Sequence, residues 1–292
     1  MSTESIFKSD SNDTQALISE FFSLCNYYTE EEKSEIRKAW NFLTEHSKGH
    51  TLLENSTEPF HLHPLRVAYI LSQNNLDISS IISAILHSVN QLGVSEEEIK
   101  KEFGEVVYKI ITTTNKILNL PINTKNILQS DAIRKMFFAM SDDARIILIT
   151  LADRLDRIRN IKLFPHDYQK LIAESCIDIW APLADRLGMQ KEKNEFEDLS
   201  LKYTNPAVFQ QIKAIVSQKK DERAAYLNKA VQSIYKASEK LGIKIVIQSR
   251  AKHFYSIYQK MRKRNKEAGE LYDLFALRIL CDSQSECYTA VG

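Results

Sequence analysis

The spacing of apolar side chains changes once along the chain, close to Gly242. Before that point apolar residues recur every three to four positions, which is the period of amphipathic helices, and glycine and proline are sparse, with seven and six copies. We therefore expect the first four-fifths of the chain to be mainly α-helical. Helical patterns cover residues 14–28, 30–46, 64–74, 78–91, 95–117, 131–140, 142–162, 167–187 and 206–240.

After Gly242 the pattern predicts a strand, a helix and a second strand. Three isoleucines alternate with other residues over 243–248, a mostly period-two pattern. From Lys252 the period lengthens to that of a helix, and a second strand opened by Asp273 follows a short gap. The apolar stripe of this helix comprises Phe254, Ile257, Tyr258 and Met261.

A cationic row accompanies that stripe. Lys252, Ser256 and Lys260 follow at steps of four, which places them along another face of the predicted helix. Two ammonium groups with a hydroxyl between them could grip a polyphosphate. The same spacing is typical of an ordinary solvated lysine face, so the pattern alone leaves both interpretations open.

The helical region carries a second candidate site. His63, His87 and Asp153 lie on three predicted helices or at their starts, and two imidazoles with a carboxylate are a plausible set of metal ligands. Scattered over ninety residues, such a set is more typical of unrelated surface and core side chains. Spacing alone therefore does not establish a metal site.

Composition excludes several classes of protein. The 292 residues are 43% apolar and 26% charged with a formal net charge of +1, which suits a globular protein of two domains and gives no global attraction to DNA or a membrane. The four cysteines form no Cys-x-x-Cys pair, the N-terminus has no apolar signal segment, and no apolar run approaches the roughly 20 residues that cross a bilayer. We expect a cytoplasmic location.

The C-terminal segment resembles a known family. It reads SRAKHFYSIYQKM over 249–261 and LYDLFALRI over 271–279, similar to the start of the synthetase domain of RelA/SpoT homologues. These enzymes make and degrade (p)ppGpp in the stringent response. The resemblance implies an α+β nucleotidyltransferase-like domain that moves the pyrophosphate of ATP to the 3′-hydroxyl of GTP or GDP. It assigns ATP contacts to Arg250, Lys252, Ser256 and Lys260, a catalytic Mg²⁺ ligand to Asp273, and a further nucleotide contact to Arg278.

The helical region resembles the HD-type hydrolase domain of the same family. The matching segments, in order, include EPFHLHPL at 58–65, AILH at 84–87, LADRL at 151–155 and APLA at 181–184. An active hydrolase of the family holds Mn²⁺ with two histidines and two aspartates. The corresponding residues here are His63, His87, Ser88 and Asp153.

Four departures from the family pattern fall on this hydrolase site. Ser88 replaces a carboxylate ligand, and the following Glu-Asp pair of the family falls on the acid-free segment 90–92. Asp156 and Arg157 stand where the family has His-Asn, and no arginine precedes the His-Pro-Leu motif between Trp40 and His63. We therefore expect a retained HD scaffold with a decayed hydrolase and no Mn²⁺, which makes the chain RelA-like.

These resemblances predict the domain organisation. We expect an N-terminal helical extension (1–34), an HD-type domain (35–200), connecting helices (201–240) and an incomplete start of the synthetase domain (241–292). Because the sequence stops within the synthetase pattern, we expect this polypeptide not to catalyse synthesis, and ribosome contacts would require C-terminal regions beyond it. A working Mn²⁺-dependent (p)ppGpp hydrolase and a catalytically silent nucleotide-binding module remain as alternatives.

Overall fold

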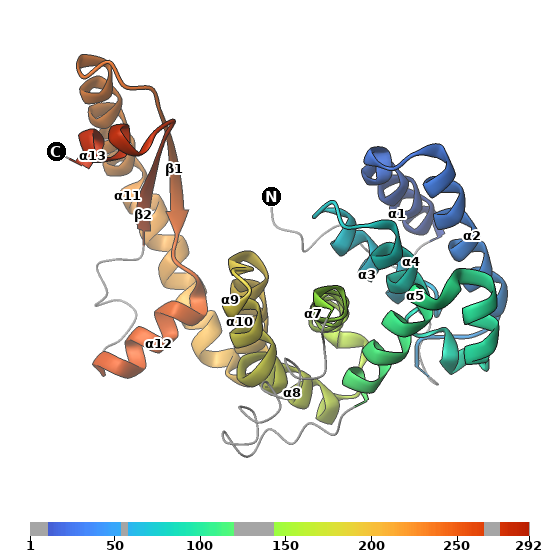
Figure 1. The fold of residues 1–292 in the computed structure, drawn as a ribbon. Helices are drawn as coiled ribbons and strands as arrows, with labels where there is room; N and C mark the ends of the chain where they lie inside the picture. The colour runs from blue at the N-terminus through green and yellow to red at the C-terminus, as the bar shows by residue number, and fades with distance from the viewer. Residues whose placement is uncertain (1–10, 54–57, 120–142, 266–274, 292) are drawn as a thin grey trace. The chain divides into compact units, whose positions relative to one another are not determined.

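The computed structural model describes residues 11–53, 58–119, 143–265 and 275–291, and it confirms the predicted fold class (Figure 1). Helices dominate, and a small two-stranded sheet follows them. The predicted helix over 131–140 and Asp273 lie outside the described residues. The chain divides into two compact units, Met1–Phe196 and Glu197–Gly292.

The described part of the first unit consists mainly of helices. Most predicted helical segments are present, with ends that differ by a few residues. They are α1 (Ser11–Leu24), α2 (Glu30–His46), α3 (Leu62–Ser72), α4 (Ile78–Leu86), α5 (Glu96–Leu118), α7 (Ala144–Arg159), α8 (His166–Ser175) and α9 (Ala181–Arg186). The unit also contains the first part of α10 (Gln190–Thr204), a helix that none of the predicted segments covers.

Local sequence signals start several of these helices. Thr29 and Glu32 form a reciprocal capping box at the start of α2, in which each side chain accepts a hydrogen bond from the other's backbone N–H, at 3.2 and 2.8 Å. At the starts of α5 and α7 a single side-chain oxygen, of Ser95 and Asp143 respectively, accepts one backbone N–H of the helix. Within α5, Gly104 adopts a positive φ of 83° and kinks the helix, a conformation open to glycine at little cost.

The predicted helix over 167–187 is interrupted. A π-helical turn, Cys176–Trp180, lies between α8 and α9, and Gly188 follows with a positive φ of 75°. Trp180 is fully buried, and the guanidinium of Arg154 lies 5.2 Å from the centre of its ring. The turn therefore brings a large core side chain against α7.

Packing of α3, α4 and α7 determines where the polar residues of the first unit lie. Leu65 of α3, Ile85 of α4 and Ile149 of α7 are fully buried, and α3 packs against both other helices. Their apolar positions recur at helical spacing and form the buried face of each helix, and polar side chains occupy other buried positions on these helices and at their ends. His63, His87 and Asp153 occupy three of those positions.

The second unit joins a long helix to the small sheet. It contains the end of α10, then α11 (Pro206–Lys240), β1 (Ile245–Ala251), α12 (Phe254–Arg264), β2 (Phe275–Cys281) and α13 (Gln284–Val291). Of these, only α13 and the end of α10 lie outside the segments predicted above. β1 and β2 pair antiparallel, with Ile247 opposite Ile279. The strand expected from residue 243 begins instead at Ile245 and continues to Ala251.

One face of this sheet meets α11 while other side chains remain exposed. Ile245 is buried, and the N–H of Ile247 donates to the hydroxyl of Tyr235 on α11 at 3.4 Å. Val246 and Leu280 are exposed, as the alternation along a strand requires. None of the described helices is long and apolar enough to span a membrane.

Candidate functional site

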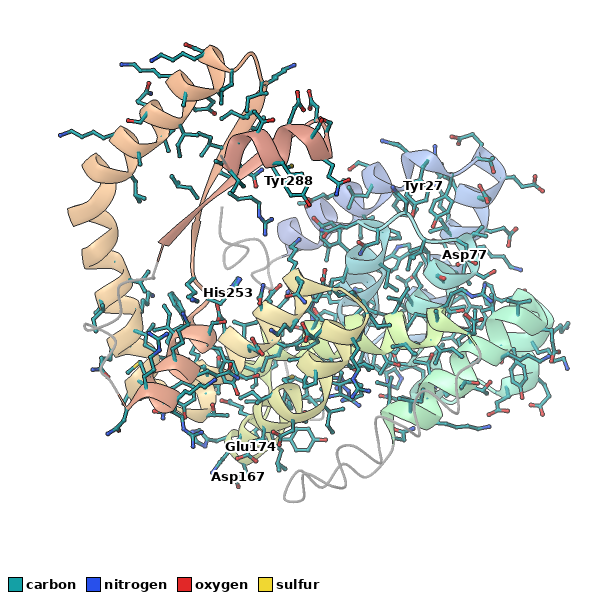
Figure 2. All side chains as sticks on the ribbon, turned by 60° about the vertical axis from the view of Figure 1, so that its left-hand side comes forward. Tyr27, Asp77, Asp167, Glu174, His253 and Tyr288 are labelled. Atoms are coloured by element: carbon teal, nitrogen blue, oxygen red, sulfur yellow. The ribbon has the colours of Figure 1, made fainter. Side chains whose placement is uncertain are left out.

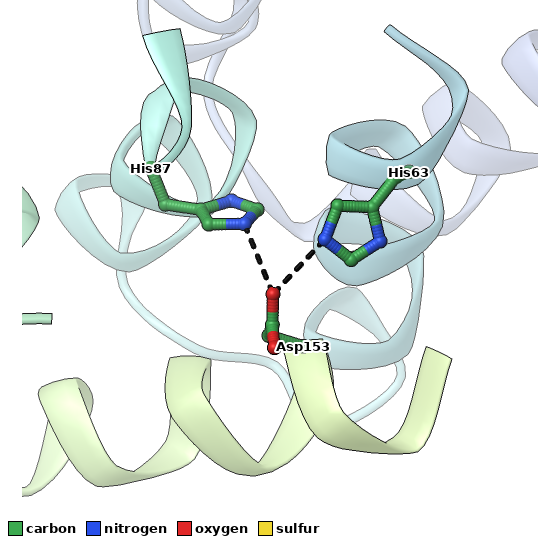
Figure 3. Close-up of side chains that lie close together, drawn as sticks. All are labelled: His63, His87 and Asp153. Atoms are coloured by element: carbon green, nitrogen blue, oxygen red, sulfur yellow. Dashed lines mark hydrogen bonds and ion pairs between the residues drawn. The ribbon is translucent and has the colours of Figure 1, made fainter. Parts of the chain in front are cut away.

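His63, His87 and Asp153 converge in the first unit (Figure 3). Asp153 Oδ1 lies 3.0 Å from Nε2 of His63 and 3.4 Å from Nε2 of His87. The three side chains are buried, and their donor atoms lie within 4.8 Å of one another. Residues ninety positions apart thus form one compact group that could hold a metal ion.

The second nitrogen of each imidazole is held by an acceptor outside this group. Nδ1 of His87 donates to the carbonyl of Ala84 at 2.7 Å, and Nδ1 of His63 donates to Oδ2 of Asp156 at 2.7 Å. Such contacts fix the orientation of a ring and direct its Nε2 inward, as they do around metal-binding histidines. Here both Nε2 atoms face the same carboxylate oxygen.

Two arginines pair with the two aspartates. Arg157 is four positions after Asp153 on α7, and its Nε donates to Oδ2 at 3.0 Å and to Oδ1 at 3.2 Å. Arg66 is three positions after His63 on α3, and its Nε donates to Oδ1 of Asp156 at 2.7 Å. The Nη2 of Arg66 also donates to Glu58 at 2.5 Å, which extends the network to a third carboxylate.

These groups balance their charges within the protein. Three carboxylates face three guanidiniums, because Nε of Arg154 also lies 3.7 Å from Oδ2 of Asp153. Buried charges are tolerated when they are paired and hydrogen-bonded in this way. The carboxylates are those of Glu58, Asp153 and Asp156, and the guanidiniums are those of Arg66, Arg154 and Arg157.

The pairing shifts the titration of the buried groups. Burial acts to raise the pKa of Asp153, but the Arg157 guanidinium and the contacts with His63 and His87 hold that pKa well below its usual range. Burial likewise opposes ionisation of Asp156, yet Arg66 and His63 lower its pKa to about 2. For His63 burial lowers the pKa, and the bonds to the two aspartates outweigh it, so the net direction is upward.

The residues present do not make up the four-donor site that the resemblance implies. The two imidazoles and Asp153 keep distances that suit cis ligands of a divalent cation. The fourth position is the neutral hydroxyl of Ser88, a poor ligand for a hard dication, and Arg157 already neutralises the remaining carboxylate. A cation at this point would have to compete with a guanidinium of the chain itself.

Several buried polar atoms near the C-terminal end of α4, which His87 caps, have no hydrogen-bond partner among the described residues. They include Oγ of Ser88, which directly follows His87, and Oδ1 of Asn90. These two positions fall on the carboxylate ligand and the acid segment that the resemblance implies. Neither supplies an acid that could take a proton from water.

The second unit positions the residues expected to bind nucleotide. Ser256 and Lys260 lie one turn apart on α12, and Arg278 lies on β2 with an exposed side chain, opposite Gln248 of β1. Arg250 lies near the end of β1, opposite Ala276. The structure thus brings Ser256 and Lys260 onto one helix and leaves Arg278 on a separate element.

The prediction that Lys252 shares this helix is wrong. β1 ends at Ala251 and α12 begins at Phe254, with His253 extended at φ −61° and ψ 143°, so Lys252 lies in the connection (Figure 2 labels His253). The helical periodicity was extended two residues too far, because capping residues carry no apolar signal. Lys252 is nevertheless half-buried beside the start of α12.

The apolar stripe of α12 is confirmed. Ile257 is fully buried in a cluster with side chains from α10 and α11, and the other stripe residues pack against it. The helix is therefore attached by one face, which fixes the direction in which Ser256 and Lys260 lie. The cluster consists of Leu201, Phe209, Ile212, Val216 and Ile257, with Phe254, Tyr258 and Met261 partly buried against it.

Comparison with known proteins matches both segments. Residues 39–190 match the family described as "HD domain", and residues 249–292 match "Region found in RelA / SpoT proteins". The chain belongs to the RelA/SpoT family. The HD match contains His63, His87 and Asp153, and the RelA/SpoT match contains Arg250, Lys252, Ser256, Lys260 and Arg278.

RelA/SpoT relatives with two different names are similar to the chain. A guanosine-3′,5′-bis(diphosphate) 3′-pyrophosphohydrolase of Borreliella burgdorferi is 38% identical over 263 residues, which are 90% of this chain and 39% of the relative. A protein of the same name from Aquifex aeolicus is 35% identical, over 88% of this chain and 37% of the relative. A GTP pyrophosphokinase of Myxococcus xanthus is 32% identical, over 92% and 36%. The chain thus spans under two-fifths of the length of these relatives.

Sequence reasoning missed part of the buried network. Glu58 and Arg66 were not singled out, and Asp156 was noted only as a departure from the family pattern. A signal was present: Arg66 follows His63 by three positions and Asp156 follows Asp153 by three, so each shares a helix face with a candidate ligand. Arg66 and Asp156 carry opposite charges, so the two side chains are expected to pair where α3 meets α7.

Proposed function

We propose that the chain is the N-terminal part of a GTP pyrophosphokinase and that its HD site has lost (p)ppGpp hydrolase activity. The proposed reaction moves pyrophosphate from ATP to the 3′-hydroxyl of GTP or GDP, in the stringent response. The observation that carries the loss of hydrolysis is the pairing of Arg157 with Asp153, with Nε 3.0 Å from Oδ2. The proposal for synthesis rests on the kept sequence of 249–261 and on the attachment of α12.

The chemistry of hydrolysis requires groups that this pocket lacks in the described residues. A metal-bound water needs an open coordination position on a cation, and a nearby acid to take its proton. The carboxylate expected at position 88 is a serine, and Asn90, Gln91 and Leu92 supply no acid. The ion pair between Arg157 and Asp153 instead favours a closed, structural role for the pocket.

The residues assigned to the synthetase site would act by neutralising the negative charge of the phosphates. Lys252 and Lys260 are cations that would bind the phosphates of ATP, and the hydroxyl of Ser256 lies one turn from Lys260. Neutralising phosphate oxygens makes the phosphorus easier to attack and the departing group easier to release. Mg²⁺ would supply further positive charge at the phosphates, and we assign Asp273 as one of the residues that would hold it.

The full organisation and partners are part of the proposal. We assign 1–34 to an N-terminal extension, 35–200 to the HD-type domain, 201–240 to connecting helices and 241–292 to the start of the synthetase domain. The nucleotides would be ATP with GTP or GDP. Contact with the ribosome would belong to regions of the relatives outside the matched part.

Hydrolysis of (p)ppGpp is the second candidate. Two observations favour it: the 3.0 and 3.4 Å distances from Asp153 to the two imidazoles, and the hydrolase names of two relatives. It would require a cation to displace Arg157 from Asp153. The third candidate is a nucleotide-binding module without catalytic activity. It differs from the proposed pyrophosphokinase only in forming no product.

One pair of assays separates these candidates. For hydrolysis, the purified chain is mixed with labelled ppGpp and Mn²⁺, and pyrophosphate release above a His87→Ala control would contradict the decay of the site. For synthesis, a protein that also carries the rest of the synthetase domain is given ATP with GTP or GDP. Formation of (p)ppGpp supports the first proposal, and nucleotide binding without product supports the silent module.

A further inference from the structure

α12 begins without a cap of its own. The first N–H groups of a helix have no partner within the helix, and the side chain of the N-cap residue usually accepts one of them. His253 occupies the N-cap position of α12, and its side chain makes no capping hydrogen bond. The N–H of Tyr255 donates instead to Oδ1 of Asp198, 2.9 Å away and 57 positions earlier in the chain. The cap of α12 therefore comes from α10.

The second oxygen of this carboxylate faces the N-cap residue. Oδ2 of Asp198 lies 3.7 Å from Nδ1 of His253, and both side chains are partly buried. A carboxylate is the charge that suits a helix N-terminus, because the exposed N–H groups there carry partial positive charge. One side chain thus contacts the backbone of Tyr255 and the ring of His253 at the same end of α12.

A second contact between α10 and α12 lies one turn further along α10. Leu201, three positions after Asp198 on α10, belongs to the buried cluster that contains Ile257 of α12. Apolar packing fixes which face of α12 is covered but constrains sliding along the axis weakly, because it is not directional. The directional hydrogen bond from Tyr255 to Asp198 supplies that constraint.

We propose that Asp198 is a positioning residue for nucleotide binding, which fixes the start of α12 and with it Lys252, Ser256 and Lys260. The carboxylate also fills the place where a helix N-terminus would otherwise attract a phosphate group. A polyphosphate is thereby directed to the cationic side chains and away from the helix end. This inference rests on the proposed function, because it assumes that these residues meet ATP.

Two substitutions at one position separate geometry from charge. Asp198→Asn keeps an oxygen that accepts the Tyr255 N–H and removes the charge, whereas Asp198→Ala removes both. Glu239→Ala, an exposed acid at the far end of α11, is the control for loss of one negative charge in the same unit. Lys252→Ala and Lys260→Ala report on the ATP site itself.

The first measurement is hydrogen exchange at the Tyr255 amide in the nucleotide-free chain. We expect exchange at least about tenfold faster in Asp198→Ala, and close to the unsubstituted rate in Asp198→Asn and Glu239→Ala. Equal protection in the unsubstituted chain and Asp198→Ala would overturn the inference. Loss of protection in Asp198→Asn as large as in Asp198→Ala would also overturn it, since the amide oxygen should replace the carboxylate oxygen.

The second measurement is the affinity of the same variants for ATP, made in a protein that also carries the rest of the synthetase domain. We expect affinity to fall about tenfold in Asp198→Ala, to be kept or raised in Asp198→Asn, and to stay unchanged in Glu239→Ala. Rescue by asparagine is the feature that a general loss of stability would not produce. If Asp198→Ala does not fold, reduced affinity in Asp198→Asn alone overturns the inference.

The lysine variants separate the inference from the proposed function. If Lys252→Ala and Lys260→Ala weaken ATP binding and Asp198→Ala does not, the role of Asp198 is wrong and the proposed function stands. If neither lysine variant weakens binding, or the unsubstituted protein with the rest of the synthetase domain does not bind ATP, the nucleotide site is wrong and both ideas fall.

Discussion

The guanidinium of Arg157 lies against the carboxylate of Asp153, which faces both His63 and His87. Its Nε is 3.2 Å from Oδ1 of Asp153, the same oxygen that lies 3.0 Å from Nε2 of His63. A side chain of the protein thus supplies positive charge next to the donor group that a metal would use. The two histidines and Asp153 keep the arrangement of an HD site, while arginines of the chain itself neutralise the carboxylates around them.

Arg66 should be a major contributor to the stability of the first unit. It is buried between Glu58 and Asp156, so Arg66→Met leaves two buried carboxylates without their main partner. Removing one partner of a buried ion pair costs about 3–5 kcal/mol of unfolding free energy. Urea denaturation measures the change. The control is Lys100→Met, whose ion pair with Glu105 is exposed and whose loss should lower the free energy of unfolding far less than Arg66→Met does.

A divalent cation should bind after two substitutions and not before. In Ser88→Asp/Arg157→Asn a carboxylate replaces the neutral hydroxyl and the competing guanidinium is removed. We expect Mn²⁺ at a hundredfold excess over Kd to raise the melting temperature of this variant by roughly 5–10 °C. The unsubstituted chain should show no rise.

Calorimetry or a fluorescence-based thermal melt measures the melting temperature with and without Mn²⁺. Adding His87→Ala to the double variant should abolish the rise, because it removes one imidazole donor. A comparable rise in the unsubstituted chain would show that Arg157 does not keep a cation out. Ser88→Asp alone should not restore hydrolysis of ppGpp, since the acids expected over 90–92 are still missing.

The cysteines should differ strongly in reactivity. Burial, partly offset by Lys33, raises the pKa of Cys25 from its ordinary value of 9.0 to about 11, whereas Cys287 is exposed. Two pKa units reduce the thiolate fraction about 100-fold at pH 8, and burial slows access further. Iodoacetamide labelling followed by peptide mass spectrometry should therefore modify Cys287 long before Cys25, and equal rates would contradict the buried position.

The same shift has a consequence for stability against pH. The folded protein favours the neutral thiol of Cys25, because its folded pKa is higher than the unfolded value. This contribution is fully present below pH 9 and is lost as pH rises towards 11. Cys25→Ala should lack that part of the alkaline loss in denaturation curves measured between these pH values.

Much of the fold could be predicted because its signals are local. Helical periodicity located most described helices, and the stripe around Ile257 identified the buried face of α12. The boundary at Lys252 was placed wrongly, because the true cap comes from Asp198, which lies too far along the chain for any local pattern to indicate. The π-helical turn at Cys176–Trp180 likewise has no periodic signal of its own.

The residues of the candidate site could be predicted from the sequence, but the hydrogen bonds and ion pairs among them could not. The motifs around His63, His87 and Asp153 indicated three residues that the structure brings together. The pairing of Asp156 with Arg66 depends on how α3 packs on α7. Arg157 reaches Asp153 along α7 itself, where the two residues are four positions apart. The sequence read alone therefore showed what the family pattern had lost, and the structure adds what occupies its place.

The cationic residues around α12 should contribute separately to ATP binding. Lys252→Ala and Lys260→Ala each remove one charge that would meet a phosphate, and a hydrogen bond to a charged group contributes about 1.5–3 kcal/mol, or roughly 10–100-fold in affinity. Lys263→Ala is the matched control, because Lys263 is exposed near the end of α12 and outside this row. Equal losses in all three variants would indicate general electrostatic attraction instead of a site.

Asp273 should be required for pyrophosphate transfer and dispensable for folding. It lies outside the described residues, so its role as a Mg²⁺ ligand rests on its place in the segment LYDLFALRI. In a protein that carries the rest of the synthetase domain, Asp273→Asn replaces an anionic ligand with a neutral one of nearly equal size. We expect (p)ppGpp formation from ATP and GTP or GDP to fall by at least about 100-fold with little change in the melting temperature, because Mg²⁺ prefers carboxylate oxygens. A rate near that of the unsubstituted protein would place the catalytic cation elsewhere.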